Sequence, residues 1–211
     1  AMKILALECS TELLSVAVYV GGALSQCVDD SGNRHGDRLL CLIDAALADA
    51  GVAKLDLSAD AFGCGPGAVT GVRMAVAAAQ GIAYGLDIPA LPVSSLAALA
   101  QEAFDRDAAT PILALADARM GEVYAGYFDV DQDGLVVAIG DEQLAAPDAL
   151  VLPGDDVWCA VGPGFRVHRT ALELRFGYRL DAFRHAALPH ASAIARLGAR
   201  ALREGLAVPA H

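Results

Sequence analysis

The feature that most constrains the fold is a pattern that occurs twice in the chain. A short apolar segment, a Gly-Pro-Gly turn and a helix-forming segment follow one another around Gly65-Pro66-Gly67 and again around Gly162-Pro163-Gly164. Strand-like runs precede both copies, which predicts two halves of related topology, each a mixed β-sheet with packed helices. Gly-Pro turns also occur in unrelated folds, so the alternative of a chance repeat stays open at this point.

The first half predicts three antiparallel strands and then alternating helices and strands. Gly21-Gly22 between two apolar runs is a strong hairpin signal. We expect strands over 3–9, 13–20, 23–29, 59–64 and 89–94, and helices over 34–51, 72–86 and 95–104.

The pattern restarts after Asp105-Arg106-Asp107. Strands are expected over 111–117, 122–130, 135–140 and 157–161, and helices over 166–175 and 189–203. The predicted subdomains are therefore 1–106 and 107–211, and the last helix is allowed to pack back on the first subdomain.

Composition excludes several classes of protein. With 55% hydrophobic and 19% charged residues the chain can build a buried core, so it is not disordered. Its apolar stretches are interrupted well before the roughly 18 residues that a membrane-spanning helix needs. Ala1 before Met2 is typical of a cloning remnant, and no signal peptide follows. We expect a cytoplasmic protein without a membrane partner.

Cysteine usage and net charge also bear on the compartment and on the partners of the protein. The five cysteines form no C-x-x-C pair, as expected for reduced core thiols. The net charge of −11 repels phosphate backbones, so another component should hold any nucleic acid.

The glycine-rich segment from Cys64 to Arg73 connects a predicted strand to a predicted helix. Its Gly65, Gly67, Thr70 and Gly71 lie where backbone N–H groups at a helix start would suit a phosphate. The spacing matches neither a Walker A loop nor G-x-G-x-x-G. The structural alternative is a tight turn in which Gly67 allows close backbone approach and Thr70 caps the helix.

Two predicted helices carry more apolar residues than one core can cover. Leu39, Leu40, Cys41, Leu42 and Ile43 are consecutive, and the helix over 72–86 is apolar or small on nearly every face. This excess favours a helix-mediated interface with another chain. The alternative is that both helices lie deep within a layered fold.

Candidate catalytic groups do not assemble into a known pattern. The histidines contain no H-x-x-x-H or H-E-x-x-H pair, and no G-x-S-x-G elbow is present. Asp117, Arg119 and Glu122 are interpreted as a solvated turn. No catalytic residue and no metal ligand is assigned.

Four segments carry a resemblance to a known family. KILALECST, His35, GPGAVTGVRMAVAAAQGIAYGLDIPALPVSSL and ALADARMGEVYAGYF resemble the bacterial TsaB (YeaZ) family of tRNA threonylcarbamoyladenosine (t6A) biosynthesis, over residues 2–130. The resemblance implies an α/β, actin/Hsp70-like (ASKHA, ribonuclease H-like) duplicated fold.

It also implies a function. Family members support a catalytic paralogue, TsaD, together with the ATPase TsaE, and self-associate as homodimers when alone. They contact tRNA only through the complex and have no cofactor of their own, with ATP or ADP expected at the complex interface. Ser95 and Leu99 stand where the paralogue carries two metal-binding histidines, which supports a non-catalytic subunit.

The resemblance gives two sets of candidate residues. The predicted partner interface lies on two helices and comprises His35, Arg38, Leu39, Leu42, Ile43, Arg73, Val76, Ala77 and Gln80. The predicted nucleotide site comprises Glu8, Ser10, Thr11, Gly65, Gly67, Thr70 and Gly71, with Glu8 replacing the Asp usual at the end of the first strand. The alternative function is an autonomous ATPase or phosphotransferase of the same fold that uses this second set.

Overall fold

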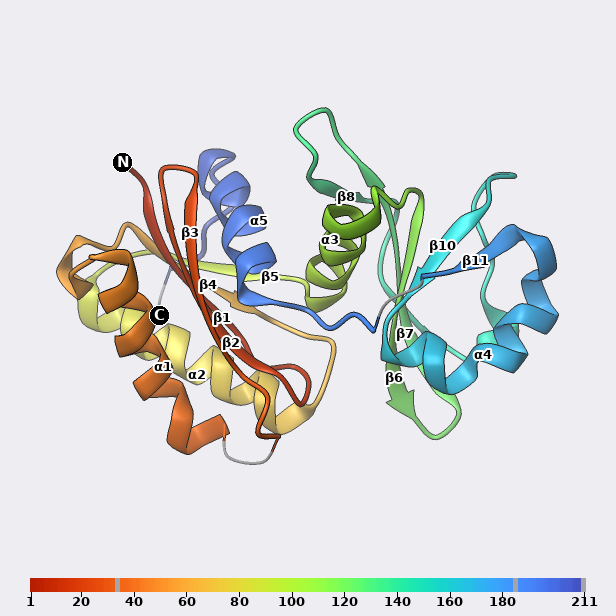
Figure 1. The fold of residues 1–211 in the computed structure, drawn as a ribbon, viewed down its shortest axis with the longest axis horizontal. Coiled ribbons are helices and arrows are strands. Elements are labelled where there is room, and N and C mark those ends of the chain that lie inside the picture. Colours follow the sequence, from red (N-terminus) through yellow and green to blue (C-terminus); the bar gives the residue numbers. More distant parts are fainter. Residues whose placement is uncertain (33–34, 184–185, 210–211) are drawn as a thin grey trace. The chain divides into compact units, whose positions relative to one another are not determined.

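The computed structural model describes residues 1–32, 35–183 and 186–209, and Figure 1 shows the fold. The chain forms two compact units. Unit 1 comprises Ala1–Ala98 and Pro189–His211, and unit 2 comprises Leu99–Leu188. The division thus lies between Ala98 and Leu99, within a helix, where we expected it after residue 106, and the last helix belongs to unit 1. No helix in the described part of the chain is long and apolar enough to cross a membrane.

Unit 1 is built on a five-stranded mixed sheet. Its strands are β1 (Lys3–Glu8), β2 (Leu14–Val20), β3 (Ala23–Asp29), β4 (Ala59–Gly63) and β5 (Ala90–Val93), in the order β3-β2-β1-β4-β5. β2 is antiparallel to β1 and β3, whereas β4 is parallel to β1 and β5. The hairpin closes through Gly21 and Gly22, which both have positive φ, a conformation that glycine adopts at little cost.

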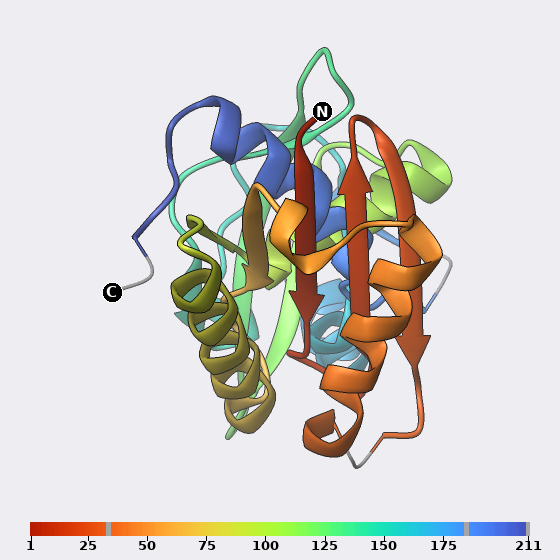
Figure 2. The same cartoon turned by 90° about the vertical axis from the view of Figure 1, so that its left-hand side faces the viewer.

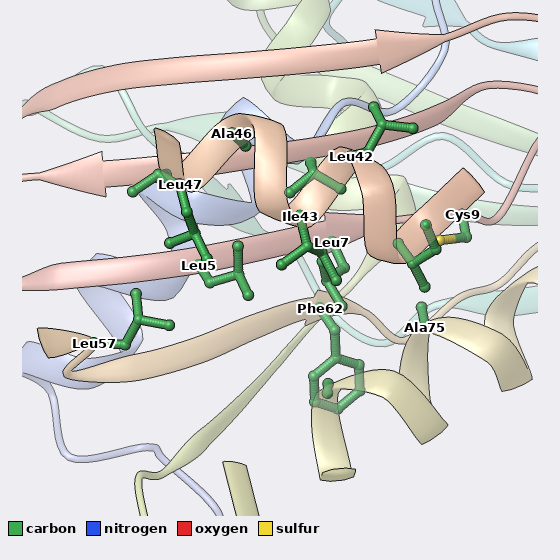
Figure 3. Close-up of a cluster of buried hydrophobic side chains, with 14 of the residues drawn as sticks. Leu5, Leu7, Cys9, Leu42, Ile43, Ala46, Leu47, Leu57, Phe62 and Ala75 are labelled. Atoms are coloured by element: carbon green, nitrogen blue, oxygen red, sulfur yellow. The ribbon is translucent and has the colours of Figure 1, made fainter. Parts of the chain in front are cut away.

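Helices cover both faces of this sheet. α1 (His35–Ala50) and α2 (Val69–Leu86) pack on one face, and α5 (Ala191–Arg203) packs on the other, as Figure 2 shows. Side chains alternate between the two faces along each strand. Leu5 and Leu7 of β1 therefore meet the helix pair, and Figure 3 shows them beneath α1. On the opposite face, Gly198 of α5 approaches Ala61 so closely that an added Cβ would lie 2.8 Å from the Ala61 side chain.

Unit 2 repeats the topology of unit 1. Its strands are β6 (Ile112–Arg119), β7 (Glu122–Val130), β8 (Val136–Ala138), β9 (Gln143–Ala145), β10 (Trp158–Val161) and β11 (Leu180–Ala182). The path β8-β7-β6-β10-β11 has the order and directions of β3-β2-β1-β4-β5, with β9 added beside β7. The predicted duplication is confirmed.

The helices of unit 2 complete the repeat. α4 (Pro163–Phe176) follows β10 as α2 follows β4, and α3 (Ser95–Asp107) leads from β5 to β6. The core contains Trp158, whose ring meets Tyr127 edge-on at 5.5 Å. Short 3-10 turns lie at Lys54–Asp56, Pro147–Ala149 and Gly177–Arg179.

Most predicted elements are present, with shifted ends. α2 begins at Val69 instead of residue 72. α4 begins at Pro163 instead of residue 166, because proline suits the first turn of a helix. The strands β9 and β11 were not predicted. Both are three residues long, which is too short for an alternating pattern to be recognised.

Candidate functional site

Glu8 lies at the carboxyl end of β1 and is fully buried. Its Oε1 accepts a 2.6 Å hydrogen bond from the backbone N–H of Ser10, and its Oε2 accepts one of 2.9 Å from the Ser95 hydroxyl. Burial raises the pKa of Glu8 above its usual range, although these hydrogen bonds oppose the shift. Both carboxylate oxygens therefore have partners within the chain.

The glycine-rich turn packs directly against the chain that follows β1. A Cβ added to Gly67 would lie 2.5 Å from the Ser10 carbonyl oxygen, and one added to Gly71 would lie 1.9 Å from the Cys9 carbonyl oxygen. The Ala68 N–H donates a 2.8 Å hydrogen bond to the Ser10 carbonyl. These glycines are therefore explained by close backbone contact within unit 1.

The predicted cap at Thr70 is wrong. α2 begins at Val69 with Ala68 as its N-cap residue, and no side chain caps it. Thr70 lies in the first turn and is exposed. A capping side chain stands at the N-cap position, where its oxygen accepts the N–H of the second or third helical residue, and that position is held by Ala68.

The structure brings most of the predicted nucleotide residues to one place. The carbonyl of Gly65 accepts a 2.8 Å hydrogen bond from the Ser95 N–H, so the turn also contacts the start of α3. Thr11 accepts a hydrogen bond from the Leu13 N–H at 3.2 Å. Nucleotide binding by these residues stays a prediction.

The start of α3 is held by two adjacent serines. The Ser94 hydroxyl accepts N–H bonds from Leu96 and Ala97 at 3.1 and 3.2 Å, in the manner of an N-cap. Ser95 faces Glu8 and is 2% exposed, and Leu99 is equally buried.

Three of the predicted interface residues on α1 lie in the core. Leu39, Leu42 and Ile43 are 3%, 7% and 4% exposed, and Figure 3 shows Leu42 and Ile43 pointing toward the sheet. Helical periodicity separates the five consecutive apolar residues, leaving Leu40 and Cys41 exposed. This burial corrects the assignment of those three side chains to a partner surface.

The other predicted interface residues on α1 are His35 and Arg38. Arg38 is exposed, and its Nε lies 2.8 Å from Asp29 Oδ2. The pKa of Asp29 is lowered by its hydrogen bonds from Ser31 and by Arg38. The side chain of His35 lies outside the described residues.

The predicted residues on α2 lie on its outer side. Arg73, Ala77 and Gln80 are exposed and Val76 is half-buried, while small residues at a spacing of four face the sheet. The predicted interface residues did not include Tyr84, which follows Gln80 by one helical turn and is 74% exposed. The 3.6-residue periodicity of the helix places Tyr84 on the same side as Gln80, and this spacing could have predicted its exposure.

A groove of about 360 Å³ lies between α1 and α2. Its walls are mostly apolar, and an ion pair of 2.6 Å between Asp44 and Lys54 lies at its edge. The lining residues are Leu5, Leu40, Ile43, Asp44, Leu47, Lys54, Leu57, Gly81, Ile82, Gly85 and Leu86.

Sequence reasoning also missed Asp60, which lies in the middle of β4. Its exposed fraction is 0%, and neither carboxylate oxygen has a hydrogen-bond partner among the described residues. Because strand residues alternate, Asp60 shares the face of Phe62 and lies beneath α2, beside Leu5. Burial raises its pKa well above the usual range.

The turn between β6 and β7 agrees with the solvated turn that we predicted. Arg119 and Met120 have positive φ and are 88% and 98% exposed. Asp117 lies 3.4 Å from the His168 ring, at a kink in α4. In the described part of the chain, no group of three or more His, Cys, Asp or Glu side chains could hold a metal ion.

Comparisons with known proteins identify the relatives of the chain. The family model described as TsaD, tRNA N6-adenosine threonylcarbamoyltransferase, matches residues 29–173. The tRNA threonylcarbamoyladenosine biosynthesis protein TsaB of Escherichia coli is 35% identical over 78% of this chain and 73% of its own length. TsaB of Haemophilus influenzae is 43% identical over 58% of this chain and 52% of its own. The solved structure of YeaZ from Pseudomonas aeruginosa matches with a TM-score of 0.89 and 37% identity, over 100% of this chain and 96% of that one.

Proposed function

Because this chain belongs to the TsaB (YeaZ) family, with its duplicated actin/Hsp70-like (ASKHA) fold, we propose that it acts in the biosynthesis of N6-threonylcarbamoyladenosine (t6A) in tRNA. Its role is that of a non-catalytic subunit. It binds the catalytic paralogue TsaD through the outer side of α1 and α2, and it works with the ATPase TsaE.

The observation that carries this proposal is a pair of unexplained glycines in α2. Gly81 lies in the interior of α2 and Gly85 lies one turn later, in the last turn of the helix, and an added Cβ at either would meet nothing within 4 Å. Neither has a positive φ. A glycine in a helix interior costs about 1 kcal/mol relative to alanine, so Gly81 weakens α2, and neither glycine serves the packing of this chain.

A helix of another protein gives both glycines a role. Where glycines line a groove, the backbone of a partner helix can approach closely. Leu40 lines the groove beside them and is 67% exposed, and Tyr84, which lies between the two glycines in the sequence of α2, is 74% exposed. Aromatic side chains such as that of Tyr84 are enriched in the centres of protein interfaces.

The contacts around Glu8 support a role without catalysis. The carboxylate is engaged by Ser10 and Ser95, and the glycine turn packs against Cys9 and Ser10. These groups hold unit 1 together, which leaves the ATPase alternative without an observation in its favour. Ser95 and Leu99, in place of two histidines, give a metal no imidazole ligand.

A non-catalytic role of this chain determines the partners that we propose. TsaD and TsaE are the partners, and this chain forms a homodimer through the same helix face when TsaD is absent. It contacts tRNA only within the complex, has no cofactor of its own, and acts in the cytoplasm. Any ATP or ADP belongs to the complex interface.

Reconstitution tests the proposal. TsaD, TsaE, tRNA, threonylcarbamoyl-AMP and this chain are combined, and t6A is measured with each protein omitted in turn. We expect t6A only in mixtures that contain both TsaD and this chain, and we expect Ala77→Arg to abolish it together with binding to TsaD. Thr170→Arg, on the exposed side of α4, is the control and should retain both. Formation of t6A by this chain alone would overturn the proposal.

A further inference from the structure

The last two turns of α2 lie over the buried carboxyl of Asp60. The Ile88 N–H donates a 3.0 Å hydrogen bond to the Ala83 carbonyl, and the Asp60 N–H donates one of 3.1 Å to the Pro89 carbonyl. The chain thus passes from the end of α2 directly to Ala90, which is the register partner of Asp60 in β5. Because Ala83 faces the sheet and is 0% exposed, this end of the helix covers Asp60.

The surroundings of Asp60 in the described part of the chain are apolar. On its own face of the sheet it lies beside Leu5 and Phe62, and the sheet-facing residues of this half of α2 are alanines. Cys9, which follows β1, lies at the start of α2 near Gly71. The charged and titratable groups of the flanking elements are paired with one another, as Lys3 with Asp56 and Asp44 with Lys54, or exposed, as Arg73, Tyr84 and Asp87.

This end of α2 is also weakly held. Gly81 and Gly85 contribute no side chain to its packing, and glycine lowers the stability of a helix. Gly81, Gly85 and Leu86 line the groove between α1 and α2 together with Leu5. Since Leu5 is the register partner of Asp60 in β1, the groove extends down to the residue beside the buried carboxyl. Segments with few packing contacts open locally at the lowest free energy.

We propose that ionisation of Asp60 opens the last two turns of α2, and that a partner bound on this helix closes them again and returns a proton to Asp60. This inference rests on the proposed function for the identity of the partner, TsaD. A carboxylate without donors is unfavourable in an apolar site, and an outward shift of the helix end connects it with water in the groove. A partner helix that fills the groove excludes this water, so the complex favours the neutral acid. The proton passes to the solvent on opening and is taken up from the solvent on binding.

The direction of the pH effect follows from the two environments of the carboxyl. Burial raises the pKa of Asp60 well above its usual range while the helix is closed, whereas an open, hydrated site returns the pKa toward about 4. The preference for the closed form is therefore complete below about pH 4 and is lost as the pH rises toward the closed-state pKa. Because the proton and the partner favour the same form, each strengthens binding of the other. Affinity for TsaD should thus fall with rising pH, by up to about tenfold per pH unit.

Calorimetric titration with TsaD measures the proton uptake. The binding enthalpy at about pH 8 is compared in phosphate and in Tris, and the difference gives the number of protons taken up, because the two buffers have different ionisation enthalpies. We expect the wild type to take up more protons than Asp60→Asn, by up to about one per complex. Uptake by TsaD itself is common to both and cancels. Asp141→Asn, at an exposed position, is the matched control and should behave as the wild type.

Hydrogen exchange of the chain alone tests the opening without TsaD. Protection of the amides of residues 82–88, corrected for the pH dependence of intrinsic exchange, should fall in the wild type between about pH 5 and 8. Asp60→Asn should keep this protection constant. Residues 72–76, at the start of α2, are the internal control and should behave alike in both proteins. A fall of equal size at residues 82–88 in Asp60→Asn would show that Asp60 does not control the helix end.

The two measurements separate this inference from the proposed function. Binding to TsaD with equal proton uptake by the wild type and Asp60→Asn would overturn the inference and leave the proposed function in place. No binding heat with either protein would overturn the proposed function and the role of TsaD here. Hydrogen exchange would then still decide whether Asp60 opens the end of α2.

Discussion

The hydroxyl of Ser95 donates a 2.9 Å hydrogen bond to Glu8, and this contact ties the end of β1 to the first turn of α3. Both residues are buried. Since Gly63 of β4 lies so close that an added Cβ would overlap the Glu8 carboxylate, three separate segments of unit 1 meet at one side chain.

Ser95→Ala should destabilise the protein by about 1–3 kcal/mol, because it leaves one buried carboxylate oxygen without its donor. Urea unfolding followed by circular dichroism measures the change. Thr170→Ala, at an exposed position, should have almost no effect. A loss of equal size in both variants would argue against a special role for the contact.

Asp60 should make stability fall as pH rises. Burial raises its pKa well above the usual range in the folded state, while the unfolded chain releases this proton near pH 4. The folded state then binds more protons, so the stabilisation from Asp60 is complete below about pH 4 and is lost toward its folded pKa. Asp60→Asn should remove this slope and exceed the wild type in unfolding free energy at neutral pH.

Urea unfolding of both proteins between about pH 4 and 8 measures the slopes. The exposed substitution Asp141→Asn is the control and should keep the wild-type slope. Parallel curves for wild type and Asp60→Asn would exclude a neutral carboxyl at this position.

Gly81→Ala and Gly71→Ala should have opposite effects on stability. At Gly81 an added methyl group meets nothing, so alanine should raise the unfolding free energy by up to about 1 kcal/mol. At Gly71 it would overlap the Cys9 carbonyl and should cost about 1–3 kcal/mol. Gly81→Ala should nevertheless weaken binding to TsaD, which calorimetry measures. An undiminished affinity would show that the partner helix does not need the glycines of α2.

Glu8→Gln should change stability and leave nucleotide behaviour alone. The wild-type chain by itself should neither hydrolyse ATP nor shift its melting temperature when ATP and Mg²⁺ are added, because the Glu8 oxygens already have partners. Hydrolysis that disappears in Glu8→Gln would favour the ATPase alternative.

Periodicity and turn chemistry were sufficient to predict most of the strands, the main helices and the duplication. They could not show which side of α1 faces the core, since Leu39, Leu42 and Ile43 look as suitable for a partner as for the interior. The role of Gly67 and Gly71 was equally hidden, because it depends on Cys9 and Ser10, which are distant in sequence. Asp60 was missed because a single polar residue in an apolar strand says nothing about its hydrogen bonds.

The contacts of Gly67 and Gly71 with the backbone after β1 explain the glycine pattern, and no ligand is needed to account for it. A chain of this fold must keep those two positions without side chains in order to close its own sheet and helix layers, whether or not it ever meets a phosphate. Such a glycine pattern in a sequence therefore indicates the fold, and a nucleotide pocket has to be established from the side chains around the pattern.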